Sequence, residues 1–290
     1  MKNVFITGGT GKIGQMLVKS LLDAECDITL LSRTVPKDLF EEKVNVIKGD
    51  LLASESYSSS LKNIDTVLHM AGLTHTNDVS RYYDVNSNGT LHLIEACKKY
   101  GVKRFVYVST RAIAADGGDY SSSKLLAEKH VQESGLNWVI IRPSEVYGAS
   151  SKEGIDGLLK ALKTLPIIPI MGNGKYRIAP VYVKDVVSFV RDILERDNLV
   201  CKIYTIAGPE VFAYVQFIDK VLKLKNLKRI KIYLPVVFCM VISKVLSWIF
   251  KDKFLAVDQI PRLLSEKSSD IYLAKQDLGF NPTRIDEIID

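Results

Sequence analysis

The chain has 290 residues, which is long enough for one large α/β domain or for one domain with a smaller lobe. Hydrophobic residues make up 47% and charged residues 25%, as in globular proteins, and the net charge of +6 is too modest to indicate nucleic-acid binding. Four dispersed cysteines form no disulfide framework, which favours a reducing cytoplasm.

Short apolar runs alternate with amphipathic stretches through the first two-thirds of the chain. Near-continuous runs of Val, Ile and Leu joined by helices predict a parallel sheet covered on both faces. The predicted strands are 3–7, 27–32, 44–49, 64–70, 103–110, 137–143, 180–183 and 202–208, and the predicted helices are 12–24, 81–100, 120–134 and 184–195. We therefore expect a doubly wound α/β (Rossmann) fold. Residues 1–143 and about 180–208 would form its nucleotide-binding domain, and residues 144–179 and 209–290 a smaller, interleaved substrate lobe.

A glycine-rich turn lies between the first predicted strand and the first predicted helix. In TGGTGKIG, the glycines let the backbone approach a pyrophosphate, and the helix N-terminus offers free N–H groups and a partial positive charge. The position between strand and helix is the one that this motif requires, although a plain tight turn is the alternative. The sequence predicts a dinucleotide site formed by Gly8, Gly11, Lys12, Ile13 and Gly14.

The end of the second predicted strand bears on which dinucleotide binds. An NAD site usually carries Asp or Glu there to bind the ribose 2′-hydroxyl, whereas this strand ends with Ser32 and Arg33. Arg33, together with Lys12, would bind a 2′-phosphate through contacts worth about 1.5–3 kcal/mol each. We therefore expect NADP(H) to bind about tenfold or more tightly than NAD(H). The alternative is a solvated surface arginine.

Tyr120 and Lys124 stand at the start of the amphipathic stretch that follows the fifth predicted strand. A YxxxK pair arises by chance about once in such a chain, so its position in the fold has to support it. Positions i and i+4 share a helix face, and an ammonium and an oxidised nicotinamide would both lower the pKa of a phenol from about 10. Tyr120 is therefore the candidate acid/base, and Thr110 a candidate to hold the reacting oxygen. The alternative is a tyrosine that caps a loop.

Taken together, the motifs resemble the short-chain dehydrogenase/reductase superfamily in its extended or atypical type, the NAD-dependent epimerase/dehydratase group. The resemblance runs almost from end to end and is specific for the superfamily, though not for a substrate. It rests on TGGTGKIG (7–14), GDL (49–51), HMAG (69–72), DVNSNGT (84–90), VST (108–110), YSSSK (120–124), IIRPSEVYG (140–148), VYVKDVV (181–187) and LGFNP (278–282).

The resemblance implies roles for individual residues. Asp50 and Leu51 would flank the adenine, and Ala71 and Gly72 would line the nicotinamide ribose side. Asn86 would bridge a helix to the active site, and Lys124 would hold the nicotinamide ribose. Tyr120 would act as general acid/base, with Thr110 orienting it. Pro143 and Ser144 would approach the carboxamide.

Three features depart from the pattern of sugar-nucleotide epimerases. Only ten residues separate Thr110 from Tyr120, Arg111 stands where small residues are common, and the family's diphosphate-binding arginine is only approximated by Arg177. These features resemble atypical members, including relatives of the complex I accessory subunit that bind NADPH tightly without turnover.

Residues 232–250 form an apolar run of about 19 residues between the basic segments KLKNLKRIK and KDK. Pro235 suits the first turn of a helix, and Ser243, Lys244, Ser247 and Lys251 mark a narrow polar stripe. The central lysine and the short length argue against a membrane span. Two interpretations stay open. The helix packs against the sheet domain or a partner in a homodimer, or it lies on a membrane surface with its lysines near anionic headgroups.

The sequence therefore predicts a cytoplasmic, NADP(H)-dependent oxidoreductase, epimerase or dehydratase that acts on a carbinol or carbonyl carbon. A nucleotide sugar or related metabolite is the leading substrate class. The alternative is a non-catalytic NADPH-binding structural or assembly protein associated with a membrane complex. The histidines have no metal-ligand spacing, so we expect no metal site, and we expect no nucleic-acid partner.

Overall fold

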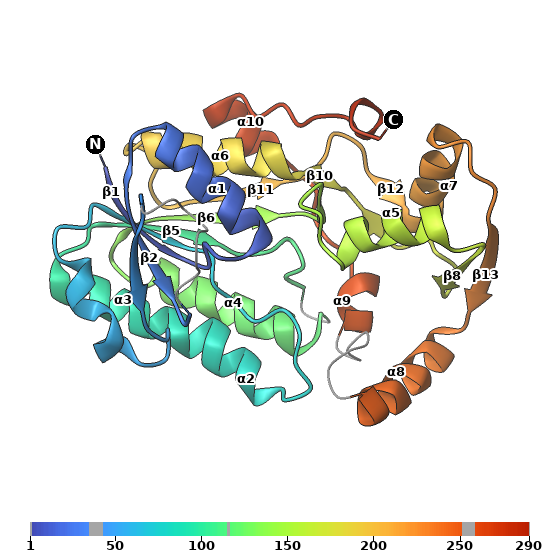
Figure 1. Cartoon of the computed structure of the whole chain (residues 1–290), viewed down its shortest axis with the longest axis horizontal. Coiled ribbons are helices and arrows are strands. Elements are labelled where there is room, and N and C mark those ends of the chain that lie inside the picture. Colours follow the sequence, from blue (N-terminus) through green and yellow to red (C-terminus); the bar gives the residue numbers. More distant parts are fainter. Residues whose placement is uncertain (1, 35–42, 115–116, 251–258, 290) are drawn as a thin grey trace.

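A seven-stranded parallel sheet forms the centre of the computed structural model, which describes residues 2–34, 43–114, 117–250 and 259–289 (Figure 1). The strand order is β11-β6-β5-β4-β1-β2-β3. From β1 the chain first adds strands toward one edge of the sheet (β2, β3) and then toward the other (β4, β5, β6, β11). Doubly wound sheets bind ligands at this switch point between β1 and β4. The predicted fold class is confirmed. The strands are β1 (Asn3–Thr7), β2 (Asp27–Ser32), β3 (Asn45–Lys48), β4 (Thr66–His69), β5 (Arg104–Val108), β6 (Asn137–Pro143) and β11 (Lys202–Ile206).

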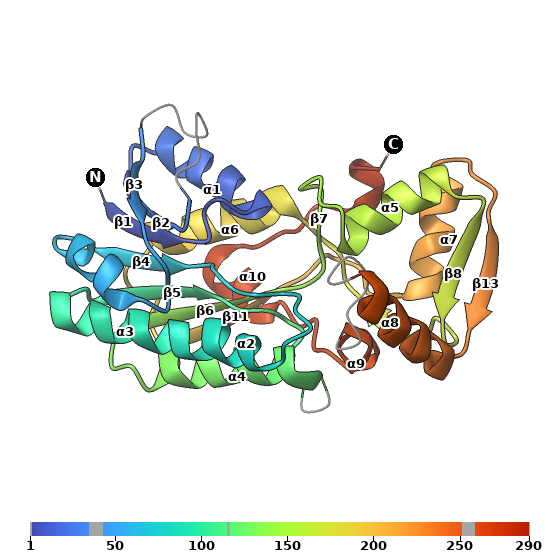
Figure 2. The ribbon, with the colours of Figure 1, turned by 60° about the horizontal axis from the view of Figure 1, so that its bottom comes forward.

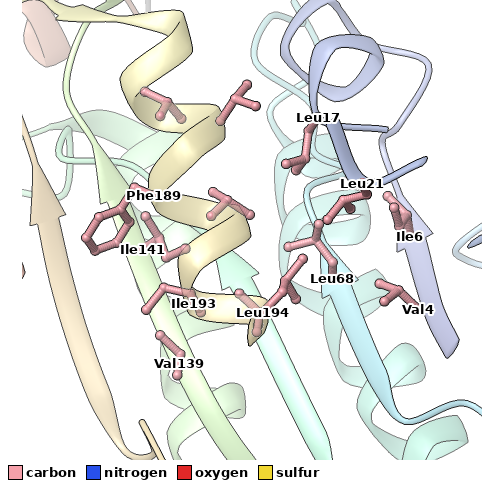
Figure 3. Packing of buried hydrophobic residues seen from close by; sticks show 14 of the residues in the cluster. Val4, Ile6, Leu17, Leu21, Leu68, Val139, Ile141, Phe189, Ile193 and Leu194 are labelled. Atoms are coloured by element: carbon pink, nitrogen blue, oxygen red, sulfur yellow. The ribbon is translucent and has the colours of Figure 1, made fainter. Parts of the chain in front are cut away.

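Helices cover both faces of this sheet (Figures 1 and 2). One face packs on α1 (Lys12–Asp23) and α6 (Val183–Glu195), and the other on α3 (Gly89–Tyr100) and α4 (Gly118–Gln132). Along β1, Val4 and Ile6 pack toward α1 and α6 (Figure 3), whereas Phe5 belongs to the core on the opposite face. Both sides of the strand are buried, so its sequence is a continuous apolar run and does not alternate.

Short elements connect the main ones at the carboxyl edge of the sheet. The chain between β4 and α3 forms α2 (Ser80–Tyr82) and then a π-helix over Tyr83–Asn88. Single π-turns of this kind are often found at functional sites. Three 3₁₀ turns cover Ser54–Ser56, Ser58–Leu61 and Ile285–Glu287.

A smaller lobe lies beyond the carboxyl edge of the sheet and has a hydrophobic core of its own (Figure 1). It contains α5 (Gly154–Thr164), α7 (Tyr214–Leu224) and the parallel pair β8 (Ile167–Met171) and β13 (Ile230–Leu234). β9 (Arg177–Ile178) pairs with β12 (Phe212–Ala213). The strand predicted at 180–183 is present as β10 (Val181–Tyr182), but it pairs with β7 (Val146–Tyr147) and not with the main sheet, so that part of the prediction was wrong.

The C-terminal segment divides its contacts between the two regions. α9 (Gln259–Leu264) lies beside α4, while α10 (Tyr272–Leu278) packs on β11. Ala274 and Phe280 belong to the sheet's core, although the sequence places the whole of 209–290 in the lobe. The domain boundaries themselves stay a prediction.

The apolar run 232–250 is not a single helix. Its first residues complete β13, and α8 (Val236–Phe250) begins directly after Pro235. Lys251 and the rest of the basic segment 251–253 lie outside the described residues. No helix in the described part of the chain is both long enough and apolar enough to cross a membrane.

Candidate active site

The glycine turn connects the end of β1 to the first residue of α1, and close packing fixes two of its glycines. Gly8 has φ +78°, and a Cβ on it would come within 2.6 Å of the Ala71 nitrogen. A Cβ on Gly14 would lie 2.4 Å from the Gly8 carbonyl oxygen. Gly11 has φ −69°, and a Cβ on it would meet the Gly8 carbonyl oxygen at 3.3 Å, so its backbone is unstrained and its crowding is milder than that of Gly8 or Gly14. The first turn of α1 also has no side-chain cap, which leaves its N–H groups available to an anion.

A cavity of about 720 Å³ opens where this turn faces the smaller lobe, within the size range of small-molecule sites. The glycine turn lines one wall through Gly8, Gly11, Lys12, Ile13 and Gly14. The same cavity is lined by the three candidate residues Thr110, Tyr120 and Pro143, together with Ser144. The fold therefore brings the predicted phosphate-binding turn and the predicted acid/base to one space. A dinucleotide fits these residues, because Gly11 leaves open backbone beside a helix N-terminus.

Tyr120 is held between side chains of both regions. It lies in the first turn of α4 and is 8% exposed, and its ring makes an edge contact with Tyr82. From the other side, the Arg262 guanidinium of α9 sits 4.4 Å from the centre of the Tyr120 ring. Thr110 accepts a hydrogen bond from the Ala112 nitrogen at 3.0 Å, which orients its hydroxyl. Residues 115–116 of the short loop between Thr110 and Tyr120 lie outside the described residues.

The proton affinity of Tyr120 differs from the expectation. Burial raises the pKa of the phenol above its ordinary value, and the charge of Arg262 and the Thr110 hydroxyl only partly oppose this. Lys124 is not among the groups that lower it. The expected lowering by the neighbouring ammonium was therefore wrong for the chain alone, because the cost of desolvating a phenolate is larger.

Lys124 lies fully within the protein, one turn along α4 from Tyr120. Its ammonium donates to the Val108 carbonyl oxygen at 3.2 Å and lies 4.2 Å from the centre of the Tyr107 ring. Burial lowers its pKa to about 7, against an opposing effect of the Glu128 carboxylate. Because this pKa lies near neutral pH, a further hydroxyl or anionic partner, such as a ribose, would stabilise the charged form of Lys124.

Asn86 lies in the π-helix and joins three segments of the chain. Its amide oxygen accepts from the Leu73 nitrogen at 2.7 Å, and its amide nitrogen donates to the Leu73 carbonyl and the Ser123 hydroxyl, each at 3.1 Å. These bonds fix the segment after β4 against α4. A Cβ on Gly72 would meet the Asn86 oxygen at 3.2 Å and Lys124 Nζ at 3.9 Å, so these three predicted residues are neighbours.

A buried chain of hydrogen bonds connects the glycine turn to Asn86. The Ala71 nitrogen donates to Thr7 Oγ1 (3.2 Å), which contacts His69 Nδ1 (2.6 Å), and His69 Nε2 contacts Thr90 Oγ1 (2.9 Å). Thr90 donates to the Asn86 carbonyl (2.6 Å), so its hydroxyl must accept the proton on Nε2. Nδ1 is then unprotonated and accepts from Thr7. Burial, with the charge of Lys124, lowers the His69 pKa to about 3, which keeps this arrangement neutral.

Seven of the predicted cofactor residues do not line the cavity. Asp50 accepts a hydrogen bond from the Leu52 N–H at 2.9 Å, as a turn residue does, and Leu51 packs against Gly89. Arg33 is exposed just after β2. The remaining four, placed above, are Ala71, Gly72, Asn86 and Lys124. Their proposed contacts with a cofactor stay predictions.

Sequence reasoning missed an ion cluster at the carboxyl ends of β5 and β6. The buried Arg111 guanidinium donates from one nitrogen, Nη2, to both carboxylate oxygens of Glu145 at 2.7 and 2.8 Å, and Lys267 lies 3.8 Å from the same carboxylate. Burial alone would raise the Glu145 pKa, but Arg111, Lys267 and hydrogen bonds hold it below its ordinary value. Arg111 was visible in the sequence as a departure from the family, whereas its partner is 34 residues away and Lys267 carries no motif.

The cavity has an excess of positive charge. Its described lining includes the cations Lys12, Arg111, Arg262 and Lys267 but only the carboxylates Glu145 and Glu153. Arg177, the approximate counterpart of the family's diphosphate-binding arginine, is exposed in β9 and lies outside the lining. Of the lining cations, Arg262 is in contact with the ring of the candidate acid/base.

Comparisons with known proteins show the family of the chain. The model of the NAD-dependent epimerase/dehydratase family matches residues 4–207. UDP-glucose 4-epimerase of Vibrio cholerae is 24% identical, over 97% of this chain and 91% of its own length. Human sterol-4-alpha-carboxylate 3-dehydrogenase (decarboxylating) is 25% identical, over 81% of this chain and 69% of its own length.

Solved structures show the same fold. UDP-glucuronic acid 4-epimerase from Bacillus cereus, in complex with UDP-glucuronic acid and NAD, superposes with a TM-score of 0.78 at 20% identity, covering 99% of this chain and 96% of its own. Since the family model spans more than half of the sequence and the fold agrees throughout, the chain belongs to the NAD-dependent epimerase/dehydratase family of enzymes.

Proposed function

We propose that this protein is an NADP(H)-dependent oxidoreductase, epimerase or dehydratase that acts on a carbinol carbon of a nucleotide sugar or a related anionic metabolite. The observation that carries the proposal is the shared cavity. Tyr120, Thr110 and the glycine turn from Gly8 to Gly14 line one space beside the switch point of the sheet. A glycine turn with an uncapped helix N-terminus and a buried phenol in one cavity are the parts that such a reaction requires.

Each of these residues has a task in the proposed reaction. When bound, the cofactor accepts or supplies a hydride at its nicotinamide ring. In the reducing direction, the protonated phenol of Tyr120, which burial favours, gives its proton to the forming alkoxide and becomes a phenolate. In the oxidising direction, the phenolate takes the proton of the carbinol oxygen. Thr110 holds the same oxygen through its oriented hydroxyl. Lys124, with a pKa lowered to about 7, would bind ribose hydroxyls and exchange a proton near neutral pH.

The charge of the cavity supports an anionic substrate. The four cations that line the space exceed its two carboxylates, and Arg111 and Lys267 share one of these, Glu145. A diphosphate or carboxylate would compensate this charge inside a partly desolvated site. The similarity to an epimerase of UDP-glucose supports the same substrate class.

Replacing Tyr120 by Phe tests the acid/base role. We expect turnover on a panel of nucleotide sugars and ketones to fall by about 10²–10⁴-fold, because one positioned proton donor contributes about that much. NADPH affinity should stay within about twofold, since Tyr120→Phe leaves the glycine turn intact. Turnover that survives the substitution unchanged would rule out the role.

Preference for NADP(H) rests on Arg33 and Lys12 and on the lack of an acid at the end of β2. We expect Arg33→Ala to reduce the ratio of NADPH to NADH affinity by about tenfold, since one charge-assisted contact with the 2′-phosphate is lost. Fluorescence titration of both cofactors measures this ratio. Arg177→Ala, an exposed arginine outside the cavity, is the matched control and should leave it unchanged. Tighter binding of NADH by the wild type contradicts the assignment.

The second candidate is a non-catalytic NADPH-binding protein that helps to assemble a membrane complex. The exposed apolar side chains of α8, Val237, Phe238 and Val241, favour it, because a free enzyme has no need of them. The Tyr120→Phe experiment separates the candidates. This second function predicts tight NADPH binding and no turnover by wild type or variant.

A further inference from the structure

The ribbon formed by β8 and β13 exposes an apolar face. Ile168 and Ile170 of β8 point into the core of the lobe, so the alternate residues point away from it. Ile167, Ile230 and Ile232 on that outer face are 45%, 64% and 43% exposed. A strand with one face in water normally carries polar residues there. The six outward positions are Ile167, Pro169 and Met171, paired with Ile230, Ile232 and Leu234.

The helix that follows the ribbon exposes apolar side chains along its first two turns. In α8, Val237 is 71% exposed, Phe238 50%, Val241 54% and Ile242 37%, whereas Ser243 is buried. A surface helix in water places its residues the opposite way. α8 starts against the end of β8, where a Cβ on Gly172 would meet Val236 at 3.2 Å, so ribbon and helix share one end of the lobe (Figures 1 and 2). We call the outer ribbon residues and these four helix residues the apolar lobe face.

The two stretches of sequence that include the ribbon and α8 are rich in cations. Residues 157–184 contain five Lys or Arg, residues 220–251 contain eight, and neither segment contains an acid. Since the whole chain has a net charge of +6, all other residues together carry −7. The two segments supply both strands of the ribbon and α8. Exposed Lys225 and Lys228, together with Arg229, lie just ahead of β13, and Lys175 follows β8. The apolar lobe face is thus bordered by cations at both ends of the ribbon.

We propose that the apolar lobe face docks on the surface of a lipid bilayer that contains anionic lipids. Apolar side chains would enter the boundary between headgroups and acyl chains, and the bordering cations would face lipid phosphates. A second copy of the chain fits less well. A two-fold interface brings the same patch of both copies together, and here it would set cations against cations. Of the acids near the ribbon, Asp219 is already paired with Lys231 at 2.6 Å.

Binding would be peripheral and dependent on salt. No helix of the described chain is able to cross the membrane, so attachment rests on shallow insertion and on charge. Each cation close to an anionic surface strengthens binding by about fivefold at low salt, and this contribution falls as ions screen it. The predicted signature is therefore weak binding to neutral lipid and strong binding to anionic lipid.

Co-sedimentation of the full chain with vesicles tests the proposal. Vesicles of phosphatidylcholine with about 30% phosphatidylglycerol should bind the protein at least about tenfold more tightly than phosphatidylcholine alone at about 0.1 M salt. Raising the salt to about 0.5 M should release most of it. Failure to sediment with the anionic vesicles at low salt would overturn the proposal.

Substitutions locate the contact. The double variant Ile230→Asp/Phe238→Asp changes two exposed residues outside the cavity, and we expect it to weaken vesicle binding at least about tenfold while NADPH affinity and Tm stay near wild type. Tyr272→Asp is the matched control, because Tyr272 is 65% exposed on α10, away from the lobe face. Equal vesicle binding by wild type and double variant refutes the proposed surface. The proposal is also refuted if the wild type forms a dimer without vesicles and the double variant does not, because the face would then bind a second copy of the chain.

Discussion

His69 is the residue whose position says most about how the site is held in place. It connects Thr7 of β1 to Thr90 of α3 through both ring nitrogens, and the direction of each hydrogen bond follows from the carbonyl acceptor at Asn86. The ring therefore serves as a neutral connector with a fixed tautomer. We infer that it positions Asn86 relative to the glycine turn without contacting a ligand itself.

The buried state of His69 makes stability depend on pH. Its pKa is lowered to about 3 in the folded chain and is about 6.5 in the unfolded chain, so below pH 6.5 the unfolded chain binds a proton that the folded chain does not. This contribution to stability is complete above pH 6.5 and is lost as the pH falls toward 3. By pH 5 the loss reaches about 2 kcal/mol.

The variant His69→Gln should remove this dependence. It will be less stable than wild type at pH 7, where the hydrogen-bond chain is weakened, but the difference should shrink by about 2 kcal/mol at pH 5. Urea unfolding at both pH values measures it. Thr90→Val breaks the same chain without removing a titrating group, so its deficit should be equal at the two pH values. A His69→Gln deficit that does not change with pH would show that the histidine is charged in the fold.

At the level of elements, the glycine turn allows a test with two similar substitutions. Gly11→Ala adds a methyl group that the fold tolerates but that projects where a pyrophosphate has to approach, so stability should change by about 1 kcal/mol or less while NADPH affinity falls at least about tenfold. Gly14→Ala places a Cβ on the Gly8 carbonyl and should cost about 1–3 kcal/mol of stability.

Urea unfolding and NADPH titration of the two variants separate the possible roles of the turn. If Gly11→Ala binds NADPH as tightly as wild type, the turn is a plain structural turn and the cofactor site lies elsewhere.

The sequence predicted the features whose determining residues lie close together in the chain, and it missed those that depend on distant segments. The strands of the central sheet were found because each is a buried run bounded by turn signals, and Tyr120 and Lys124 were found because their spacing is local. β13 was missed because IKIYL alternates within a longer apolar run, and its partner β8 lies about 60 residues away. Arg262 and Lys267 reach the cavity through the return of the C-terminal segment, which leaves no local pattern.

At the level of the whole molecule, the cluster of Arg111, Glu145 and Lys267 fastens the C-terminal segment to the sheet. Arg111 also bonds to Ser269, so the segment after α9 is tied to the ends of β5 and β6. Glu145→Gln would leave two buried cations without a compensating charge. We expect a loss of about 3 kcal/mol and a fall in Tm of roughly 6–12 °C.

Thermal and urea unfolding check this expectation. The control is Glu210→Gln, which removes a more exposed carboxylate paired with Lys220 and Arg284 and should cost less than about 1 kcal/mol. Equal losses in the two variants would show that the Arg111 cluster does not hold the segment in place.

The interleaving of sheet and lobe also sets the order in which the chain can fold during synthesis. β11, the last strand of the sheet, is made after α5 and β8 of the lobe, while β13 comes later still. A ribosome must therefore release more than 200 residues before the sheet closes, and about 30 more before the ribbon pairs. Such long-range pairing slows folding and leaves the edge of β6 open meanwhile. A nascent chain arrested before β11 should accordingly require a chaperone, whereas a chain long enough to include Phe280 and Ile285, which complete the two cores, should hold both regions.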